Sequence, residues 1–394
     1  MKRLHLFGIM AVILLASFSV SALAGDKPDF DVQWYGYFKL DGAYDQNLTS
    51  HGNFALWVKP QSLDKDDAQF NMTANQTRLG LKATGTGYGE YKVNGKLEFD
   101  LYGGVSGATV AQNKAMLQLR HAYFTLEKGN MKLLAGQSWD LISPLNASTL
   151  NYPVLWGCGN FGYRRPQISL FYTAPAGDNT KVIMSGGLFR TIGTDLTPTF
   201  SLATGEGSEG SDDGTDAAIP SFQGRFDVQH KSATGTAVRA GFSGLWGQLR
   251  AETNLGNYET YESWAANGFL QFNHSSGFGF NGEFYTGSNL SSYFGAILNG
   301  STIEGVNSTG GYGSMWFKAS KNVKFTTGAG VDKVKNEDIG SGARSQNRCV
   351  FGNVKYAIVS YVTLGLEVSS WETQYKDGEA ASNLRVQTSF ILNF

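Results

Sequence analysis

The chain has 394 residues and an almost balanced charge, with 32 lysines and arginines against 33 aspartates and glutamates. Its 26 phenylalanines, 18 tyrosines and 50 glycines stand beside only 8 prolines and 2 cysteines, a composition that indicates an all-β chain. These counts exclude a disulfide scaffold, a paired zinc motif and a basic nucleic-acid-binding surface, and no C-x-x-C-H motif is present for a covalent haem. We therefore expect neither a cofactor nor a nucleic-acid partner.

Residues 1–24 have the pattern of a secretory signal peptide: a basic start, an apolar stretch and a small-residue exit, Ala-Leu-Ala. The apolar stretch is too short for a membrane-spanning helix. We expect cleavage before Gly25, which leaves residues 25–394 as a single mature domain. That domain would carry 30 basic and 33 acidic residues, a net charge of −3.

The mature chain alternates apolar and polar residues in segments typical of half-buried β-strands. The first, VQWYGYFKLDGAYD, places Val32, Trp34 and Phe38 on one face and Lys39 and Asp41 on the other. Sixteen such strands are predicted, at 32–45, 77–85, 91–103, 114–127, 131–139, 166–174, 181–190, 222–231, 236–250, 264–275, 278–288, 311–320, 323–334, 346–358, 362–374 and 382–394.

The connections between these segments are of two kinds. Short ones such as PAGDN and SATG alternate with long ones at 46–75, 140–165, 191–221, 288–310 and 335–345. Short turns at one rim and long loops at the other are typical of a transmembrane β-barrel. In lipid an open sheet edge would leave unpaired backbone groups, so the strands must close. We predict a 16-stranded antiparallel transmembrane β-barrel with short periplasmic turns and long extracellular loops.

Two alternatives to this architecture stay open. Fourteen or eighteen strands would satisfy the same alternation. A soluble secreted all-β protein also has alternating strands, although sixteen strands would be many for a single sandwich and no propeller repeat is present.

The last segment, LRVQTSFILNF, places Leu384, Phe390 and Phe394 on one face and Arg385 and Gln387 on the other. In a closed barrel this strand must pair with the first strand. The ending SFILNF resembles the C-terminal signature of outer-membrane proteins, in which a terminal Phe is read by the assembly machinery.

The polar faces of the strands predict which charges line the lumen, because sixteen strands enclose a water-filled channel. The cations expected there as pore-lining residues are Lys39, Arg78, Lys82, Arg120, Arg225 and Arg385. The planar guanidinium fits carboxylates in a two-pronged way, so a preference for small anions is expected. The open alternative is that these cations only balance lumenal acids.

The long connection at 140–165 is the most informative loop. Its aromatic residues, which need burial, are Tyr152, Trp156, Phe161 and Tyr163. We predict that this third loop folds back into the barrel and narrows the channel, with Trp156 and Tyr163 at the constriction. Arg164 and Arg165 would lie at its return to the next strand and add positive charge. The alternative is an ordinary surface loop.

Several motifs resemble those of the trimeric porins of Gram-negative bacteria, most closely the DcaP-like group. They are YGYFKLDGAYD, TRLGLKATG, LRHAYFTLEKG, LLAGQSWDLISP and NFGYRRPQISLFY. The resemblance implies a homotrimer in the outer membrane, in contact with lipid and lipopolysaccharide, that passes dicarboxylates and other small anions. It also implies that residues 136–139 and 164–167 frame the constriction, with Arg78 and Arg120 on a basic wall opposite. A helical N-terminal stalk found in part of that group is not expected here.

The two cysteines, Cys158 in the third loop and Cys349 on a late strand, lie far apart in the sequence. A disulfide between them is compatible with the periplasm. Two free thiols fit equally well, because no spacing rule determines the pairing.

Two other classes of function also stay open. One is a structural or interaction role, as a barrel sheath around a partner such as a multihaem cytochrome, or as a surface receptor. The other is an outer-membrane enzyme, for which His51 is the only candidate base in a long loop and no nucleophile is indicated. The sequence therefore favours a channel that is not an enzyme.

Overall fold

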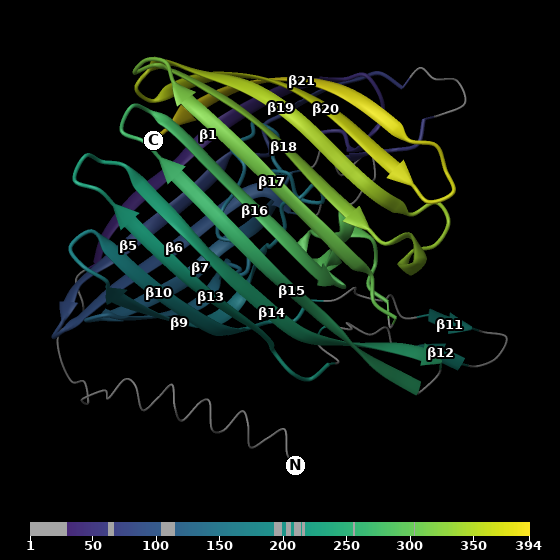
Figure 1. Cartoon of the computed structure of the whole chain (residues 1–394), viewed down its shortest axis with the longest axis horizontal. Helices are drawn as coiled ribbons and strands as arrows, with labels where there is room; N and C mark the ends of the chain where they lie inside the picture. The colour runs from purple at the N-terminus through teal and green to yellow at the C-terminus, as the bar shows by residue number, and fades with distance from the viewer. Residues whose placement is uncertain are drawn as a thin grey trace.

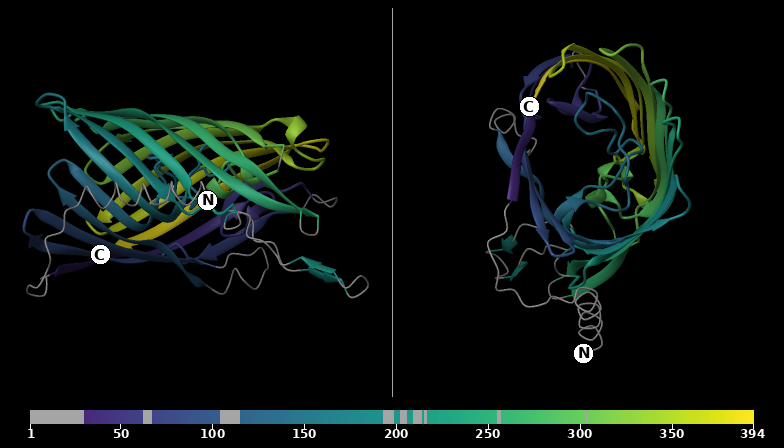
Figure 2. Two further views of the ribbon diagram at one scale, coloured as in Figure 1. Left: turned by 90° about the horizontal axis from the view of Figure 1, so that it is seen from below. Right: turned by 90° about the vertical axis from the view of Figure 1, so that its left-hand side faces the viewer.

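The computed structural model describes residues 30–61, 67–103, 115–192, 199–201, 206–208, 214, 217–254, 257–302 and 304–394. The predicted signal peptide, residues 1–24, lies outside these ranges. Within the described ranges, sixteen antiparallel strands each pair with two neighbours and form a closed barrel (Figure 1). Viewed from its end, the barrel surrounds a lumen that contains loop segments (Figure 2).

The barrel strands agree with the prediction to within a few residues at most ends. They are β1 (Phe30–Asp45), β5 (Arg78–Tyr88), β6 (Tyr91–Gly103), β7 (Met116–Lys128), β8 (Met131–Trp139), β9 (Arg164–Pro175), β10 (Thr180–Phe189), β13 (Ser221–Lys231), β14 (Ala237–Asn254), β15 (Asn257–Asn273), β16 (Phe278–Ser288), β17 (Asn307–Lys318), β18 (Val323–Val334), β19 (Arg344–Val359), β20 (Val362–Tyr375) and β21 (Ala381–Asn393). The largest difference is β15, which begins seven residues before the predicted 264–275.

The barrel closes between its first and last strands, as the terminal alternation predicts. β21 pairs with the second half of β1, from Tyr37 opposite Asn393 to Asp45 opposite Arg385. Gly36 and Phe394 extend this seam by exchanging two backbone hydrogen bonds of 3.1 Å. On its other side, β1 pairs with β5 and with the short strand β4 (Gln69–Thr73).

Deleting Phe394 is expected to weaken this seam, because both backbone hydrogen bonds to Gly36 and the ring contact with Phe38 would be lost. These contacts together are worth about 2–4 kcal/mol of unfolding free energy. Urea unfolding in detergent micelles, followed by tryptophan fluorescence, measures the loss. The control is Phe325→Ala, whose exposed ring lies on β18, away from the seam. An equal loss in the control would contradict a special role for the terminal residue.

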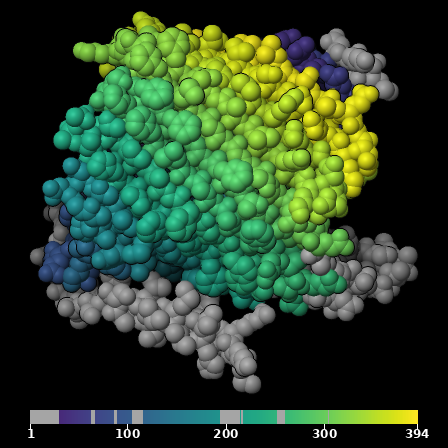
Figure 3. Space-filling model, viewed as in Figure 1, coloured from purple at the N-terminus to yellow at the C-terminus, as the bar shows by residue number. Residues whose placement is uncertain are grey.

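The two faces of the strands differ as predicted. Figure 3 shows the closely packed outer side of the barrel wall, from teal to yellow along the chain. Apolar side chains such as Trp34 (72 % exposed) and Phe390 (55 % exposed) lie on the outer surface. Their strand neighbours on the opposite face are buried and polar, for example Arg385 (1 % exposed). An apolar exterior around a polar interior is the arrangement that a bilayer selects for a barrel.

Short turns join strands at one rim, which corresponds to the periplasmic side of such barrels, and the long loops lie at the other. Elements outside the barrel wall are small: the hairpins β2 (Thr49–His51) with β3 (Phe54–Val58) and β11 (Thr199–Ser201) with β12 (Glu206–Ser208), and the 3-10 turns η1 (Ser291–Tyr293), η2 (Ala296–Leu298) and η3 (Asn336–Asp338). Within the described residues, no helix has the length and apolarity needed to cross a bilayer.

Three loops, rather than one, fold into the lumen. The third loop is buried over most of residues 140–163, which confirms the predicted inward fold. The β2–β3 hairpin and the η1–η2 segment accompany it, with Ala55 and Ile297 fully buried. Their apolar runs, FALWV and YFGAIL, lie in connections that were predicted only as long loops. Like the aromatic side chains of the third loop, these apolar side chains need burial away from water.

Candidate functional site: the lumen and its constriction loop

The third loop, residues 140–163, is here called the constriction loop, and two lumenal carboxyl groups fix it to the barrel wall. Glu283 on β16 accepts a hydrogen bond from the backbone N–H of Leu145 at 2.6 Å. Glu367 on β20 accepts two, from Leu150 at 2.6 Å and Asn151 at 3.1 Å. A buried loop without regular structure must find partners for its N–H groups, and these carboxyl oxygens supply them.

Lumenal amides complete the attachment. Gln223 on β13 accepts hydrogen bonds from the backbone N–H groups of Leu141 at 2.7 Å and Ile142 at 3.0 Å. Asn347 on β19 donates to the carbonyl of Gly157 at 2.8 Å. A large share of the polar lumenal face therefore holds the loop in place, a role that strand alternation alone does not reveal.

A basic wall faces the loop, and we define it as Arg78 on β5, Lys96 on β6 and Arg120 on β7. Arg120 is 4 % exposed and contacts two carboxylates, Glu98 at 2.8 Å and Asp100 at a still shorter distance. Arg78 and Lys96 lie 3.5 and 3.3 Å from Glu98. Three cations thus surround two carboxylates, so the wall keeps one positive charge in excess.

Two hollows lie beside the constriction loop and share part of their lining. The first, of about 350 Å³, lies between the basic wall and the loop residues Asn146, Tyr152 and Trp156. The second, of about 380 Å³, lies among the inward loops and shares Tyr152 and Trp156 with the first. These two aromatic side chains therefore lie at the junction between the two hollows, beside the basic wall.

Aromatic rings surround this junction. The ring of Trp156 lies 5.3 Å from that of Tyr163 and 4.8 Å from that of Phe294. Tyr152 lies 4.3 Å from Tyr102 on β6. Trp156 and Tyr163 were predicted from the sequence, whereas Phe294 from the η1–η2 segment and Tyr102 from β6 were not.

The structure separates the predicted cations into two groups. Arg78 and Arg120 line the first hollow, and Lys82 lies further along β5, exposed, with its ammonium 4.9 Å from the ring of Tyr35. The others belong to the contacts that hold the inward loops, and they are Lys39, Arg164, Arg165, Arg225 and Arg385.

The buried cations each have a specific partner. Arg165 pairs with Asp140 at 2.9 Å, and Arg385 pairs with Asp45 across the seam. Arg164 is sandwiched between the rings of Trp139 and Tyr163, whose centroids lie 4.6 and 4.5 Å from its guanidinium carbon.

The remaining two cations contact loop carbonyls. Lys39 donates to the carbonyl of Leu150 at 2.9 Å, and Arg225 donates to that of Leu141 at 3.3 Å. A cation held in this way orients the loop. It acts on a solute in the lumen only through its long-range electrostatic field and not by direct contact.

His51, the candidate base of an enzyme, lies in a structural setting. Its ring stacks on Phe54 at 4.4 Å and is 7 % exposed. Burial lowers the pKa of His51 to about 4, so the ring is neutral at neutral pH. Its Nδ1 accepts a hydrogen bond from the backbone N–H of Asn53 at 3.3 Å, and its Nε2 has no hydrogen-bond partner among the described residues.

The two cysteines lie in one buried cluster. Cys158 in the constriction loop is directed at the wall, with its Sγ 3.4 Å from the carbonyl of Gly330 and 3.7 Å from that of Asn347. Cys349 on β19 belongs to the same apolar cluster, and both are free thiols in the structure.

From this geometry we expect two reactive thiols per chain after unfolding in the absence of reductant, and none in the folded barrel, because both sulfurs are buried. Labelling with a maleimide before and after unfolding counts them. The variant Cys349→Ser should lose one of the two. A count of zero until a reductant is added would instead establish a Cys158–Cys349 disulfide.

Neither a protein-family model nor a curated protein matches the sequence. Solved structures do match it along nearly the whole chain. The outer membrane channel DcaP of Acinetobacter baumannii is 20 % identical with a TM-score of 0.69, and the alignment covers 94 % of this chain and 100 % of that one. The chain has the fold of an outer-membrane porin. This confirms, at the level of fold, the resemblance to the DcaP-like group.

Other porins match with lower similarity. The anion-selective porin from Comamonas acidovorans is 12 % identical with a TM-score of 0.57, over 93 % of this chain and 100 % of that one. OmpT of Vibrio cholerae, described in a trimer form, is 11 % identical with a TM-score of 0.55, over 93 % and 99 %. These structures, too, share the outer-membrane porin fold with this chain.

Proposed function

We propose that this porin-fold protein is an outer-membrane diffusion channel for small hydrophilic solutes, with a preference for small anions such as dicarboxylates. The observation that carries the proposal is the first hollow, in which the basic wall faces Tyr152 and Trp156 across about 350 Å³. The mechanism is passive diffusion, and it requires no cofactor and no covalent chemistry.

The preference for anions follows from the charges in this hollow. Arg78, Lys96 and Arg120 outnumber Glu98 and Asp100 by one charge. A narrow route with low-dielectric walls focuses such an excess and raises the local concentration of the opposite charge. Arg78 and Lys96 are only partly buried, so their N–H groups can contact a solute in addition to Glu98.

Dicarboxylates suit this arrangement because two cations lie on neighbouring strands of the wall. Arg78 and Lys96 flank the same carboxylate, Glu98, and a solute with two carboxylates can contact both. The description of the Comamonas neighbour as anion-selective supports the sign of the preference. The resemblance of the sequence motifs to the DcaP-like group, which implies uptake of dicarboxylates, supports the solute class.

The test is the reversal potential of single channels in a planar bilayer under a potassium chloride gradient. We expect a potential of the sign that indicates chloride permeation, and we expect added succinate, but not neutral succinamide, to reduce the chloride current. A potential that indicates cation selectivity would overturn the anion preference. Equal effects of succinate and succinamide would overturn the dicarboxylate preference.

We further propose a homotrimer in contact with lipid and lipopolysaccharide, which the trimer form described for the Vibrio neighbour supports. Analytical ultracentrifugation in detergent is expected to give three barrels per particle, and a monomer would contradict the proposal.

The sheath alternative requires room for a partner inside the barrel. The inward loops occupy that space, with Ala55, Ile297 and Cys158 each 0 % exposed. The enzyme alternative requires a nucleophile hydrogen-bonded to His51, and among the described residues no side chain hydrogen-bonds to its ring. A channel is therefore the function that this geometry favours.

A further inference from the structure

A second, larger hollow lies away from the constriction, at the rim of short turns. It measures about 700 Å³ and is bounded by the turns around Asn130, Asp178 and Asn273. We call it the periplasmic vestibule and define it by five lumenal side chains. They are Lys181 on β10, Gln229 and Lys231 on β13, Arg239 on β14 and Gln271 on β15.

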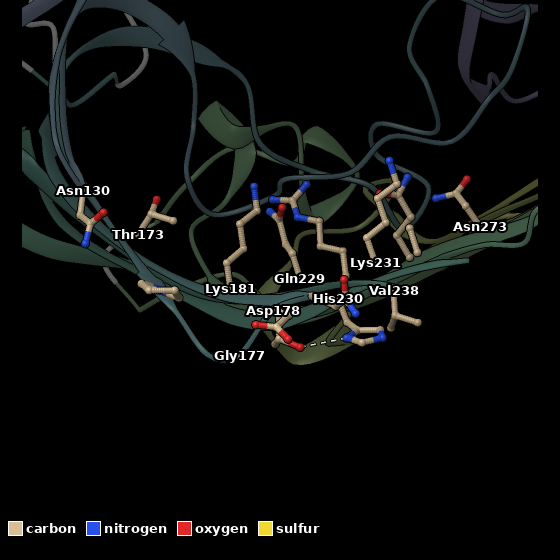
Figure 4. A pocket seen from close by; sticks show the side chains of 16 residues that line it. Asn130, Thr173, Gly177, Asp178, Lys181, Gln229, His230, Lys231, Val238 and Asn273 are labelled. Atoms are coloured by element: carbon tan, nitrogen blue, oxygen red, sulfur yellow. Dashed lines mark hydrogen bonds between the residues drawn. The ribbon is translucent and has the colours of Figure 1, made fainter. Parts of the chain in front are cut away.

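These side chains form a continuous row of donors. In the strand register Lys181 lies opposite Gln229, Gln229 opposite Arg239, and Arg239 opposite Gln271. Figure 4 shows Lys181, Gln229 and Lys231 directed to one side of the wall, into the hollow, whereas His230 and Val238 point to the other side. The uncharged Gln229 separates the cations, which limits the repulsion that directly opposed like charges would cause.

The charge of the vestibule is only partly compensated locally. Arg239 hydrogen-bonds Asp227 at 2.8 Å. Neither Lys181 nor Lys231 has a carboxylate within ion-pair distance among the described residues. The only carboxylate in the lining is that of Asp178, and Asp227 pairs with Arg239, so three cations stand against two acids and the two lysines carry the excess charge.

The spacing of these cations indicates the class of ligand. Lys181 and Arg239 are separated by one intervening strand, so their backbones lie about 10 Å apart, and Lys231 lies two residues along β13, about 7 Å from Gln229. A monovalent anion can contact one of these cations at a time. An anion with several carboxylate or phosphate groups can bridge two of them, while the glutamines donate to its remaining oxygens.

We propose that the periplasmic vestibule is a second binding site, distinct from the constriction, for small anions that carry two or more carboxylate or phosphate groups. This inference rests on the proposed channel function. A solute that leaves the constriction toward the periplasm would be held here before release, and a polyanion already in the periplasm would occupy the same site. Such a bound polyanion obstructs the lumen and reduces the ion current.

The experiment uses the complete porin in a planar bilayer and inorganic tripolyphosphate as the probe, added to one side at a time. The wild type is expected to be blocked at a lower concentration from one side than from the other, because the vestibule lies at one mouth only. The double variant Lys181→Gln, Lys231→Gln is expected to raise the half-blocking concentration on the sensitive side about tenfold and to remove the asymmetry. Equal block of the wild type from both sides would overturn the proposal.

The matched control is Lys333→Gln, which removes an exposed lysine from the outer face of β18 and should leave the block unchanged. An unchanged block in the double variant would overturn the vestibule site even if the channel is anion-selective. The reversal potential could indicate cation selectivity while the block stays asymmetric and dependent on the two lysines. That result would overturn the anion preference proposed for the constriction and support the binding site in the vestibule. Retained resistance to detergent unfolding at room temperature shows that each variant is a folded barrel.

Discussion

Replacing Glu283 and Glu367 together with alanine is expected to release the constriction loop and to raise the single-channel conductance. These carboxyl groups accept hydrogen bonds from the backbone N–H groups of Leu145, Leu150 and Asn151, which lose these partners in the variant. A hydrogen bond to such a group is worth about 1.5–3 kcal/mol, and a buried N–H left without a partner costs about 1–3 kcal/mol. The loop should therefore lose at least about 4 kcal/mol of local stability.

Two measurements check this expectation. Amide hydrogen exchange in residues 141–151 should become about a thousandfold faster, while exchange in the barrel strands stays slow. Single-channel recordings should show a larger and noisier conductance. The double substitution to glutamine keeps one acceptor oxygen at each site and should fall between the wild type and the alanine variant. Glu259→Ala on β15, at an exposed position, is the matched control.

Unchanged conductance in the alanine double variant would contradict the role of these residues. It would mean that the lumenal amides Gln223 and Asn347 hold the loop without the carboxyl groups. A loss of the folded barrel would be a different result, and the heat-dependent mobility of the protein on a gel distinguishes it from loop release.

Arg120→Ala is expected to abolish the anion preference and to destabilise the barrel. The substitution leaves Glu98 and Asp100 facing only Arg78 and Lys96, so the net charge of the hollow falls from +1 to zero. Removing one member of a buried ion-pair group typically costs about 3–5 kcal/mol, because the other members remain buried without compensation. Reversal potentials and urea unfolding measure the two effects separately.

Arg78→Ala provides the matched comparison. It removes the same charge from the same hollow, but Arg78 is more exposed than Arg120 and lies further from Glu98, at 3.5 rather than 2.8 Å. We expect a similar loss of anion preference with a much smaller loss of stability. Arg348→Ala, on the outer face of β19, should change neither quantity by a comparable amount. If neither Arg78→Ala nor Arg120→Ala shifts the reversal potential, the basic wall does not determine selectivity.

Strand β7 departs from strict alternation at one residue. Alternation predicts that Arg120 faces the lumen, and it does. The adjacent His121, which strict alternation would place on the outer face, also faces the lumen. The register explains this: Glu98 lies opposite His121 and Phe99 opposite Leu119, so Arg120 occupies a β-bulge. A bulge breaks the period of two at one residue, and no local pattern marks its position. For this reason His121 was not expected in the hollow.

The inward loops give a second example. The third loop was predicted to fold inward because its aromatic side chains need burial, and it does. The runs FALWV and YFGAIL carry the same signal in shorter form, so the other two loops could have been recognised from their composition. The contacts of these loops with Trp156 could not have been recognised from composition, because the contacts depend on where the loops meet inside the barrel.

The sequence by itself determined the strands, their outward and inward faces, and the closure between the first and last strands. Period-two alternation and turn composition are local properties, and a bilayer imposes them on every strand separately. Only the tertiary structure decided which lumenal charges are paired, as for Arg385 with Asp45, and which remain accessible, as for Arg78 and Lys181. That division depends on register and on loop insertion, which bring together residues hundreds of positions apart.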